Sequence, residues 1–159
     1  MVFLLVSLLF VTCLLHVTIA TAENFLLFPG EATELQLTET EWNMPPITTR
    51  GAGFGPIINF KTPTPKNTDN PTLETTSPAD LIILFQQNGA PVDMASLEIT
   101  AKKGFLKRDL TERIRPYIQG TSVVATDLQV PKGKFKIQII IADIKGNQTS
   151  TEYRLKVGN

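Results

Sequence analysis

The clearest pattern in the chain is an alternation of apolar and polar residues between Pro131 and Val157. Every second residue from Phe135 to Ile141 is apolar, as is every second residue from Tyr153 to Val157. A period of two is typical of a half-buried β-strand. The break between the two runs contains Gly146, which supplies the positive φ that closes a short loop. The pattern therefore predicts a β-hairpin with one apolar face and one polar face.

The register of this hairpin follows from its loop. A three-residue loop at Ile144-Lys145-Gly146 sets Asp143 opposite Asn147. On the inner face, Ile137 then lies opposite Tyr153 and Phe135 opposite Leu155. On the outer face, Lys136 lies opposite Arg154 and Lys134 opposite Lys156. Like charges that face each other across strands destabilise a sheet. Either nearby acids such as Glu152 offset the repulsion, or the patch of Lys134, Lys136, Arg154 and Lys156 is kept for an anionic partner.

Shorter strand signals precede the hairpin. Apolar or alternating runs occupy residues 56–61, 81–85, 96–101 and 122–125, and a Pro-rich polar connection covers residues 62–78. We therefore expect one all-β domain over residues 56–159. Residues 23–55 contain short apolar and acidic stretches, which predict a loosely ordered N-terminal arm. Its Trp42 either covers an edge of the sandwich or forms an aromatic platform for a sugar or peptide.

The first 22 residues have the pattern of a secretory signal. They contain no Lys, Arg, Asp or Glu, and they end in Ala20-Thr21-Ala22, a small-residue cleavage pattern. We expect cleavage after Ala22 and a periplasmic or secreted protein. The alternative is an uncleaved anchor, because the apolar run approaches the length of a membrane span. Cleavage also removes Cys13 and His16, the only cysteine and histidine. An exported chain without disulfides fits the bacterial envelope better than a eukaryotic secretory route.

The second half of the chain resembles the immunoglobulin-like and fibronectin III-like sandwich domains of exported bacterial proteins. The matching segments are Ser96–Ile99, Asp127–Phe135 and Asp143–Asn147 before the last strand. The resemblance covers residues 56–157 and implies an immunoglobulin-like antiparallel β-sandwich. Its motifs specify turns and strand ends and are nearly silent about function. Unlike antibody domains, the sandwich region has no cysteine pair and no core Trp.

Three possible chemical sites have simpler explanations. Asp109 and Glu112 have capping-box spacing, so a helix cap is favoured over an acid/base pair, and the bases nearby would keep both ionised. Gly51–Gly55 lacks the strand and helix that a nucleotide site needs. Asp143 and Asn147 could contact calcium, but Asp143 is expected to accept hydrogen bonds from the turn backbone. We expect no cofactor, no metal and no nucleic-acid partner.

The charges are divided between the two halves of the chain. Residues 23–100 have ten acids against three bases, a net charge of −7, and residues 101–159 have twelve bases against five acids, a net charge of +7. Either the halves pair with each other, or the basic half attracts anions. Without His or Cys, catalysis is disfavoured. We expect an exported structural or interaction module with an envelope protein partner. The alternative is a binding module for an anionic glycan or lipid head group.

Overall fold

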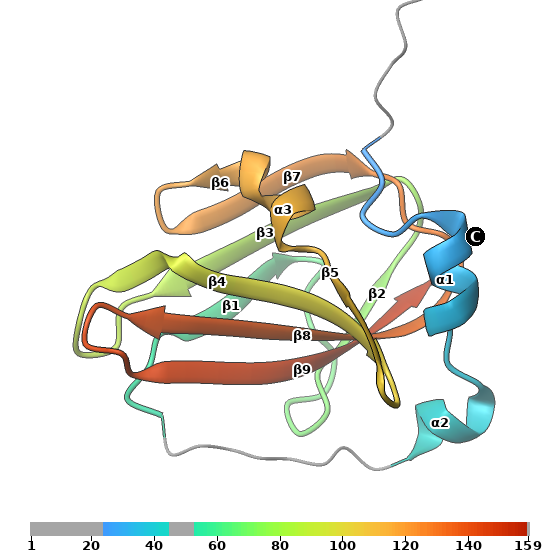
Figure 1. The fold of residues 1–159 in the computed structure, drawn as a ribbon, viewed down its shortest axis with the longest axis horizontal. Helices are drawn as coiled ribbons and strands as arrows, with labels where there is room; N and C mark the ends of the chain where they lie inside the picture. The colour runs from blue at the N-terminus through green and yellow to red at the C-terminus, as the bar shows by residue number, and fades with distance from the viewer. Residues whose placement is uncertain (1–23, 45–52, 159) are drawn as a thin grey trace, which may run out of the picture.

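The computed structural model describes residues 24–44 and 53–158, in which two β-sheets enclose one apolar core (Figure 1). The four-stranded sheet has the order β1-β3-β7-β6. Its strands are β1 (Ile57–Thr62), β3 (Ala79–Gln86), β7 (Ser122–Leu128) and β6 (Ile118–Gln119). The five-stranded sheet has the order β2-β9-β8-β4-β5. Its strands are β2 (Thr72–Thr75), β9 (Gln148–Val157), β8 (Gly133–Asp143), β4 (Val92–Lys103) and β5 (Leu106–Asp109). Neighbours are antiparallel except for β2 and β9, which run parallel.

The core lies where the inner faces of the two sheets meet. In β8 the side chains alternate between buried and half-buried positions, as the period of two in the sequence requires. Phe135, Ile139 and Ile141 are completely buried. They share one cluster with Ile83 and Val123 of the opposite sheet. The prediction of an all-β domain with two packed sheets is therefore confirmed.

The structure also confirms the predicted hairpin and its register. Ile137 lies opposite Tyr153, Phe135 opposite Leu155, Lys136 opposite Arg154 and Lys134 opposite Lys156. The loop closes through a bond of 2.9 Å from the Gly146 N–H to the Asp143 carbonyl, with Gly146 at a φ of +82°. The Asp143 N–H donates to the Asn147 carbonyl at 3.0 Å. The outer face of the hairpin thus carries the four cations that the sequence placed there.

The N-terminal arm is packed more closely than the sequence indicated. It contains two short helices, α1 (Pro29–Leu35) and α2 (Glu39–Asn43). Leu27 and Leu35 belong to the core cluster and are almost completely buried. The backbone of Leu26 also donates to Gln129 at 3.0 Å. Residues 24–37 are thus a docked part of the domain instead of a loosely ordered arm.

The loops differ from the expectation at two other points. The polar connection over residues 62–78 contains β2, which pairs with β9. The helix expected after Asp109 is α3 (Thr111–Ile114), followed by the 3-10 turn Arg115–Tyr117, and its N-cap residue is Leu110. Asp109 instead accepts a bond of 2.8 Å from the Thr111 N–H, and Glu112 contacts Arg115. The capping-box prediction is therefore wrong, because the Asp109 carboxylate closes a turn before the helix starts.

Two sequence predictions lie outside the described residues. The first is the predicted signal over residues 1–22, with its cleavage point. The second is the Gly51–Gly55 bend, of which the first two residues are not described. Within the described residues, no helix has the length and apolar character to cross a membrane.

Candidate functional site

The outer face of the five-stranded sheet brings more cations together than the hairpin alone. Lys136 lies opposite Arg154 in β9 on one side and opposite Lys102 in β4 on the other. Lys102 in turn lies opposite Lys107 in β5. Directly opposed residues of a sheet project from the same face. Arg154, Lys136, Lys102 and Lys107 therefore form one line across four strands, which we call the cation row.

Two members of the cation row were missed from the sequence. The chain shows Lys102 and Lys107 as part of an ordinary basic stretch, and nothing in it fixes how β4 aligns with β8. That alignment includes a bulge between Asp93 and Glu98, which shifts the register along the strand. One sequence feature could have indicated this arrangement: Gly104 lies between two runs of basic residues, as expected for a turn that joins two basic strands. Gly104 has a φ of +55° and turns the chain from β4 into β5.

One end of the cation row is covered by the arm. Arg154 donates to the Met44 carbonyl, and its guanidinium carbon lies 5.4 Å from the centre of the Trp42 ring. The Lys134 ammonium lies 5.5 Å from the same ring and binds Glu39 at 2.6 Å. Trp42 thus lies against cations of the outer sheet face instead of covering an edge of the sandwich. Contacts of this kind are attractive because the face of an aromatic ring is negatively polarised.

Acids also offset part of the positive charge, as the sequence suggested. Lys136 lies 3.3 Å from Glu152, the acid that the sequence singled out. Lys156 lies 3.9 Å from Glu74 of β2. All four predicted site residues are therefore on one face and each has a partner there.

The other end of the cation row is open. Among the residues that the structure describes, neither Lys102 nor Lys107 has a carboxylate within 4.0 Å. The pKa of Lys102 lies below its ordinary value of 10.5. Partial burial is the largest cause, the positive charge of Lys107 is the second, and the negative charge of Glu152 raises the pKa.

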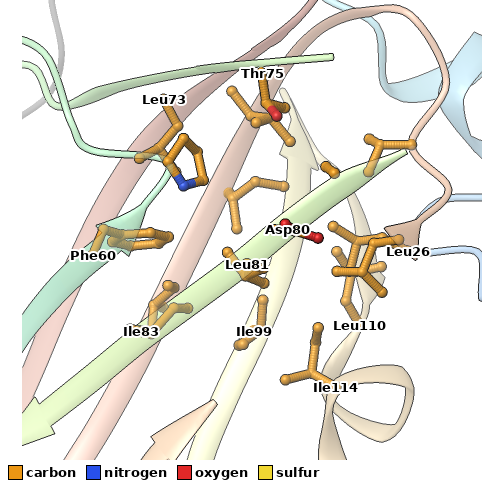
Figure 2. Close-up of a pocket in the computed structure, with 17 residues that line it drawn as sticks. Leu26, Phe60, Leu73, Thr75, Asp80, Leu81, Ile83, Ile99, Leu110 and Ile114 are labelled. Atoms are coloured by element: carbon orange, nitrogen blue, oxygen red, sulfur yellow. The ribbon is translucent and has the colours of Figure 1, made fainter. Parts of the chain in front are cut away.

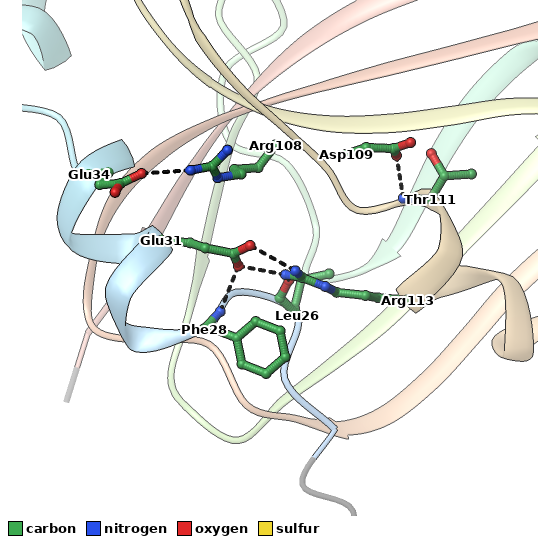
Figure 3. Close-up of polar contacts among 8 residues, drawn as sticks. All are labelled: Leu26, Phe28, Glu31, Glu34, Arg108, Asp109, Thr111 and Arg113. Atoms are coloured by element: carbon green, nitrogen blue, oxygen red, sulfur yellow. Dashed lines mark hydrogen bonds and ion pairs between the residues drawn. The ribbon is translucent and has the colours of Figure 1, made fainter.

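Ion pairs also hold α1 of the arm against the rest of the domain. Arg113 forms a two-pronged contact with Glu31, at 2.7 and 2.8 Å, and also donates to the Leu26 carbonyl (Figure 3). Arg108 of β5 binds Glu34 at 2.9 Å. The hydrogen bond from Arg113 lowers the pKa of Glu31; burial opposes this, and the Phe28 N–H adds to the lowering. Acids of the first half of the chain thus pair with bases of the second half.

A groove of about 500 Å³ lies next to the open end of the cation row. Its lining includes Thr100, Lys107, Asp109, Glu112 and Arg115. Hydrogen bonds from the Thr111 side chain and backbone lower the pKa of Asp109, burial opposes this, and the charges of Arg115 and Arg113 add to the lowering. Glu112 is held by Arg115 at 2.9 Å. Both acids are therefore engaged in local contacts within the loop.

A second hollow lies between the sheets (Figure 2). Phe60, Leu73, Ile83 and Ile114 are among the largely apolar side chains around it. Its volume of about 40 Å³ is far below the roughly 300 Å³ at which ligand pockets begin. We interpret it as a small packing gap in the core. Within the described part of the chain, no three His, Cys, Asp or Glu side chains are placed to hold a metal ion.

Comparisons with known proteins add little. No protein-family model matches the chain, and no curated protein matches it. A search of solved structures gives a crystal structure of CopC from Methylosinus trichosporium OB3b. It is 13% identical, the match covers 64% of this chain and 93% of that one, and the TM-score is 0.35. A structural similarity at this level supports no conclusion about function, so the site must be interpreted from its own residues.

Proposed function

We propose that this protein is an exported, non-catalytic interaction module of the bacterial envelope whose outer sheet face binds an anionic partner. The cation row is the observation that supports this proposal. The partner would be a phosphate, sulfate or carboxylate group of a lipid or glycan. Such groups would pair with Lys102 and Lys107, which have no carboxylate within 4.0 Å among the described residues.

The opposed cations of the outer sheet face have an energetic cost. Each directly opposed pair of like charges costs an amount comparable to the roughly 0.2–1 kcal/mol that a good pair contributes. The cation row contains three such pairs in sequence, and only part of it is offset by Glu152 and by the arm. Any uncharged polar residue could face solvent at these positions without that cost. A role in binding an anion would explain why charged residues occupy these positions.

We further propose an immunoglobulin-like fold. In such domains the first, second, fifth and fourth strands form one sheet, and the third, sixth and seventh form the other. Here β1, β3, β7 and β6 correspond to the first set, and β4, β8 and β9 to the second. This correspondence supports the resemblance that the turn motifs suggested. It carries no information about the ligand.

A purely structural or protein-binding role is the second candidate. It is favoured by the arm, which already occupies Lys134 and Arg154. In that role the cations would hold the acidic arm, and the unidentified partner would be another envelope protein. The two roles assign different members of the basic face. The structural role depends on Lys134 and Arg154, which hold the arm, whereas the binding role depends on the open cations Lys102 and Lys107.

The test is a salt series of binding measurements with heparin and with vesicles that contain phosphatidylglycerol. Exposed charges are screened within about 10 Å at 0.1 M salt, so binding should weaken as salt rises. Lys102→Gln/Lys107→Gln should weaken binding by about fivefold for each cation removed. The control Lys61→Gln/Lys145→Gln changes the net charge equally at exposed sites away from the row. We expect the first variant to unfold at the same or a higher denaturant concentration than wild type.

Two outcomes would contradict the binding role. One is the absence of binding to either anion at low salt. The other is a Lys102→Gln/Lys107→Gln variant that binds as well as the control variant. Either outcome would leave the structural role, in which Lys134 and Arg154 hold the arm.

Export is tested separately, because the segment concerned lies outside the described residues. We expect protein recovered outside the cytoplasm to begin at Glu23, since the small-residue site ends at Ala22. Intact-mass measurement gives this directly. A mass that still includes residues 1–22 would favour the membrane-anchored alternative.

A further inference from the structure

The hairpin of β4 and β5 carries an apolar tip between basic residues. Phe105, at the tip, is fully exposed, and Leu106 is about half exposed at 49%. The four flanking positions on the two strands are basic: Lys102, Lys103, Lys107 and Arg108. In Figure 1 the tip projects away from the two sheets. A Cβ at Gly104 would meet no atom within 4 Å, so the turn is surrounded by open space.

Packing within the domain does not explain this tip. A Phe side chain is usually buried, because removing it from water contributes about 1.5–3 kcal/mol. Phe105 has no such burial, although the turn between β4 and β5 could hold any polar residue at this position. The strand β5 is exposed at all four positions, and among the described strands it pairs with β4 alone. The apolar tip is therefore a surface feature whose partner must come from outside the described residues.

The charges around the tip differ in how well they are offset. Lys103 donates to the Gln36 carbonyl at 2.7 Å and lies 3.9 Å from Glu41, and Arg108 binds Glu34. Lys102 and Lys107 are the open end of the cation row. An apolar tip with uncompensated cations behind it matches the chemistry of an anionic bilayer surface. There, apolar side chains enter the boundary of the acyl chains and basic side chains remain at the head groups.

We propose that this hairpin docks onto an anionic lipid surface, with Phe105 and Leu106 entering the interface and Lys102 and Lys107 contacting lipid phosphates. The inference rests on the proposed anionic partner and names its class. A soluble acidic glycan would use the same lysines but would give Phe105 no apolar environment. The exposed aromatic tip therefore favours the lipid over the glycan.

The experiment compares vesicles of phosphatidylcholine with vesicles that also contain phosphatidylglycerol, using co-sedimentation. Phe105→Ser should weaken binding to the mixed vesicles by about tenfold, because the apolar contribution is lost. It should leave heparin binding unchanged. Phe54→Ser is the matched control, since Phe54 is also well exposed but lies outside the hairpin. A Phe105→Trp variant in a Trp42→Phe background should show a blue-shifted emission on the mixed vesicles only.

The outcomes separate this inference from the proposed function. Vesicle binding could depend on Lys102 and Lys107 but not on Phe105, with no blue shift. That result would overturn the insertion of the tip and would leave the proposed binding of an anionic partner intact. Binding to heparin but not to mixed vesicles likewise overturns the lipid and points to a glycan. Equal binding to both kinds of vesicle overturns the part assigned to the cations. Absence of binding to every anion overturns the proposed function itself.

Discussion

Asp143 shows how one side chain fixes the register on which the candidate site depends. It is only 3% exposed, and its carboxylate accepts bonds of 2.9 Å from the N–H groups of Lys145 and Asn147. The Asn147 amide adds a third bond at 2.8 Å. The pKa of Asp143 is lowered, and the hydrogen bond from the Asn147 side chain is the largest cause. Burial acts in the opposite direction, and the two backbone hydrogen bonds lower the pKa further. The carboxylate thereby closes the turn, and the turn sets Lys136 opposite Arg154.

The two faces of β8 should respond differently to truncation. Ile139 is completely buried, so Ile139→Ala should cost about 2–5 kcal/mol from the lost contacts and the cavity left behind. Gln138 lies on the outer face, where its amide donates to Ser150 at 2.8 Å in an exposed setting. Gln138→Ala should therefore stay within about 0.5 kcal/mol of wild type. Chemical denaturation measures both values. Equal losses would mean that the inner and outer rows of this strand are assigned incorrectly.

The sequence predicts those helices and strands that have a clear local pattern of apolar and polar residues. β8 alternates between buried and half-buried positions over its whole length, and β9 alternates in sequence from Tyr153 to Val157. β3 contains the continuous apolar run Leu81–Phe85. Patterns of these two kinds are typical of strands buried on one or both faces. The hairpin loop was also predictable, because its length and Gly146 fix its geometry. The outer cations of β8 and β9 followed directly. Local spacing was sufficient for half of the cation row.

The remaining elements depend on partners far away in the chain. β2 is four residues long inside a Pro-rich connection and exists through its parallel pairing with β9. β5 has no buried side chain, so it leaves no apolar pattern to detect. The arm is short and acidic, and its order depends on Arg113 and on core positions that the sequence does not connect to it. Lys102 and Lys107 were missed for the same reason, since long-range register places them beside Lys136.

For the molecule as a whole, the opposite charges of the two halves serve folding as well as the candidate surface. Glu31, Glu34 and Glu39 of the acidic half bind Arg113, Arg108 and Lys134 of the basic half. The expectation that the halves pair with each other is therefore confirmed for these residues. Within the cation row, Lys102 and Lys107 have no carboxylate within 4.0 Å among the described residues, and the proposed function assigns these two to an outside partner. One charge pattern thus both secures the arm and leaves an open basic edge.

The contribution of this pairing should appear in the pH dependence of stability. Among the ion pairs between the arm and the basic half, Glu31 with Arg113 is the least exposed, and its two-pronged geometry is favourable. Glu31→Gln should lower the free energy of unfolding by about 1–3 kcal/mol at neutral pH, because Arg113 loses its charged partner. Glu34→Gln, at the more exposed pair with Arg108, should cost less than about 1 kcal/mol.

The sign of the pH effect follows from the lowered pKa of Glu31. A carboxyl group whose pKa is lower in the folded state stabilises the fold fully above its unfolded value, here 4.5, and loses that contribution as the pH falls through the folded value. The stability difference between wild type and Glu31→Gln should therefore be largest at neutral pH and shrink on acidification below 4.5. Denaturant unfolding of both proteins along a pH series measures it. If the difference in unfolding free energy stayed constant into strong acid, Glu31 would act through packing instead of charge. If the two proteins were equally stable at neutral pH, the contact between Glu31 and Arg113 would not hold the arm.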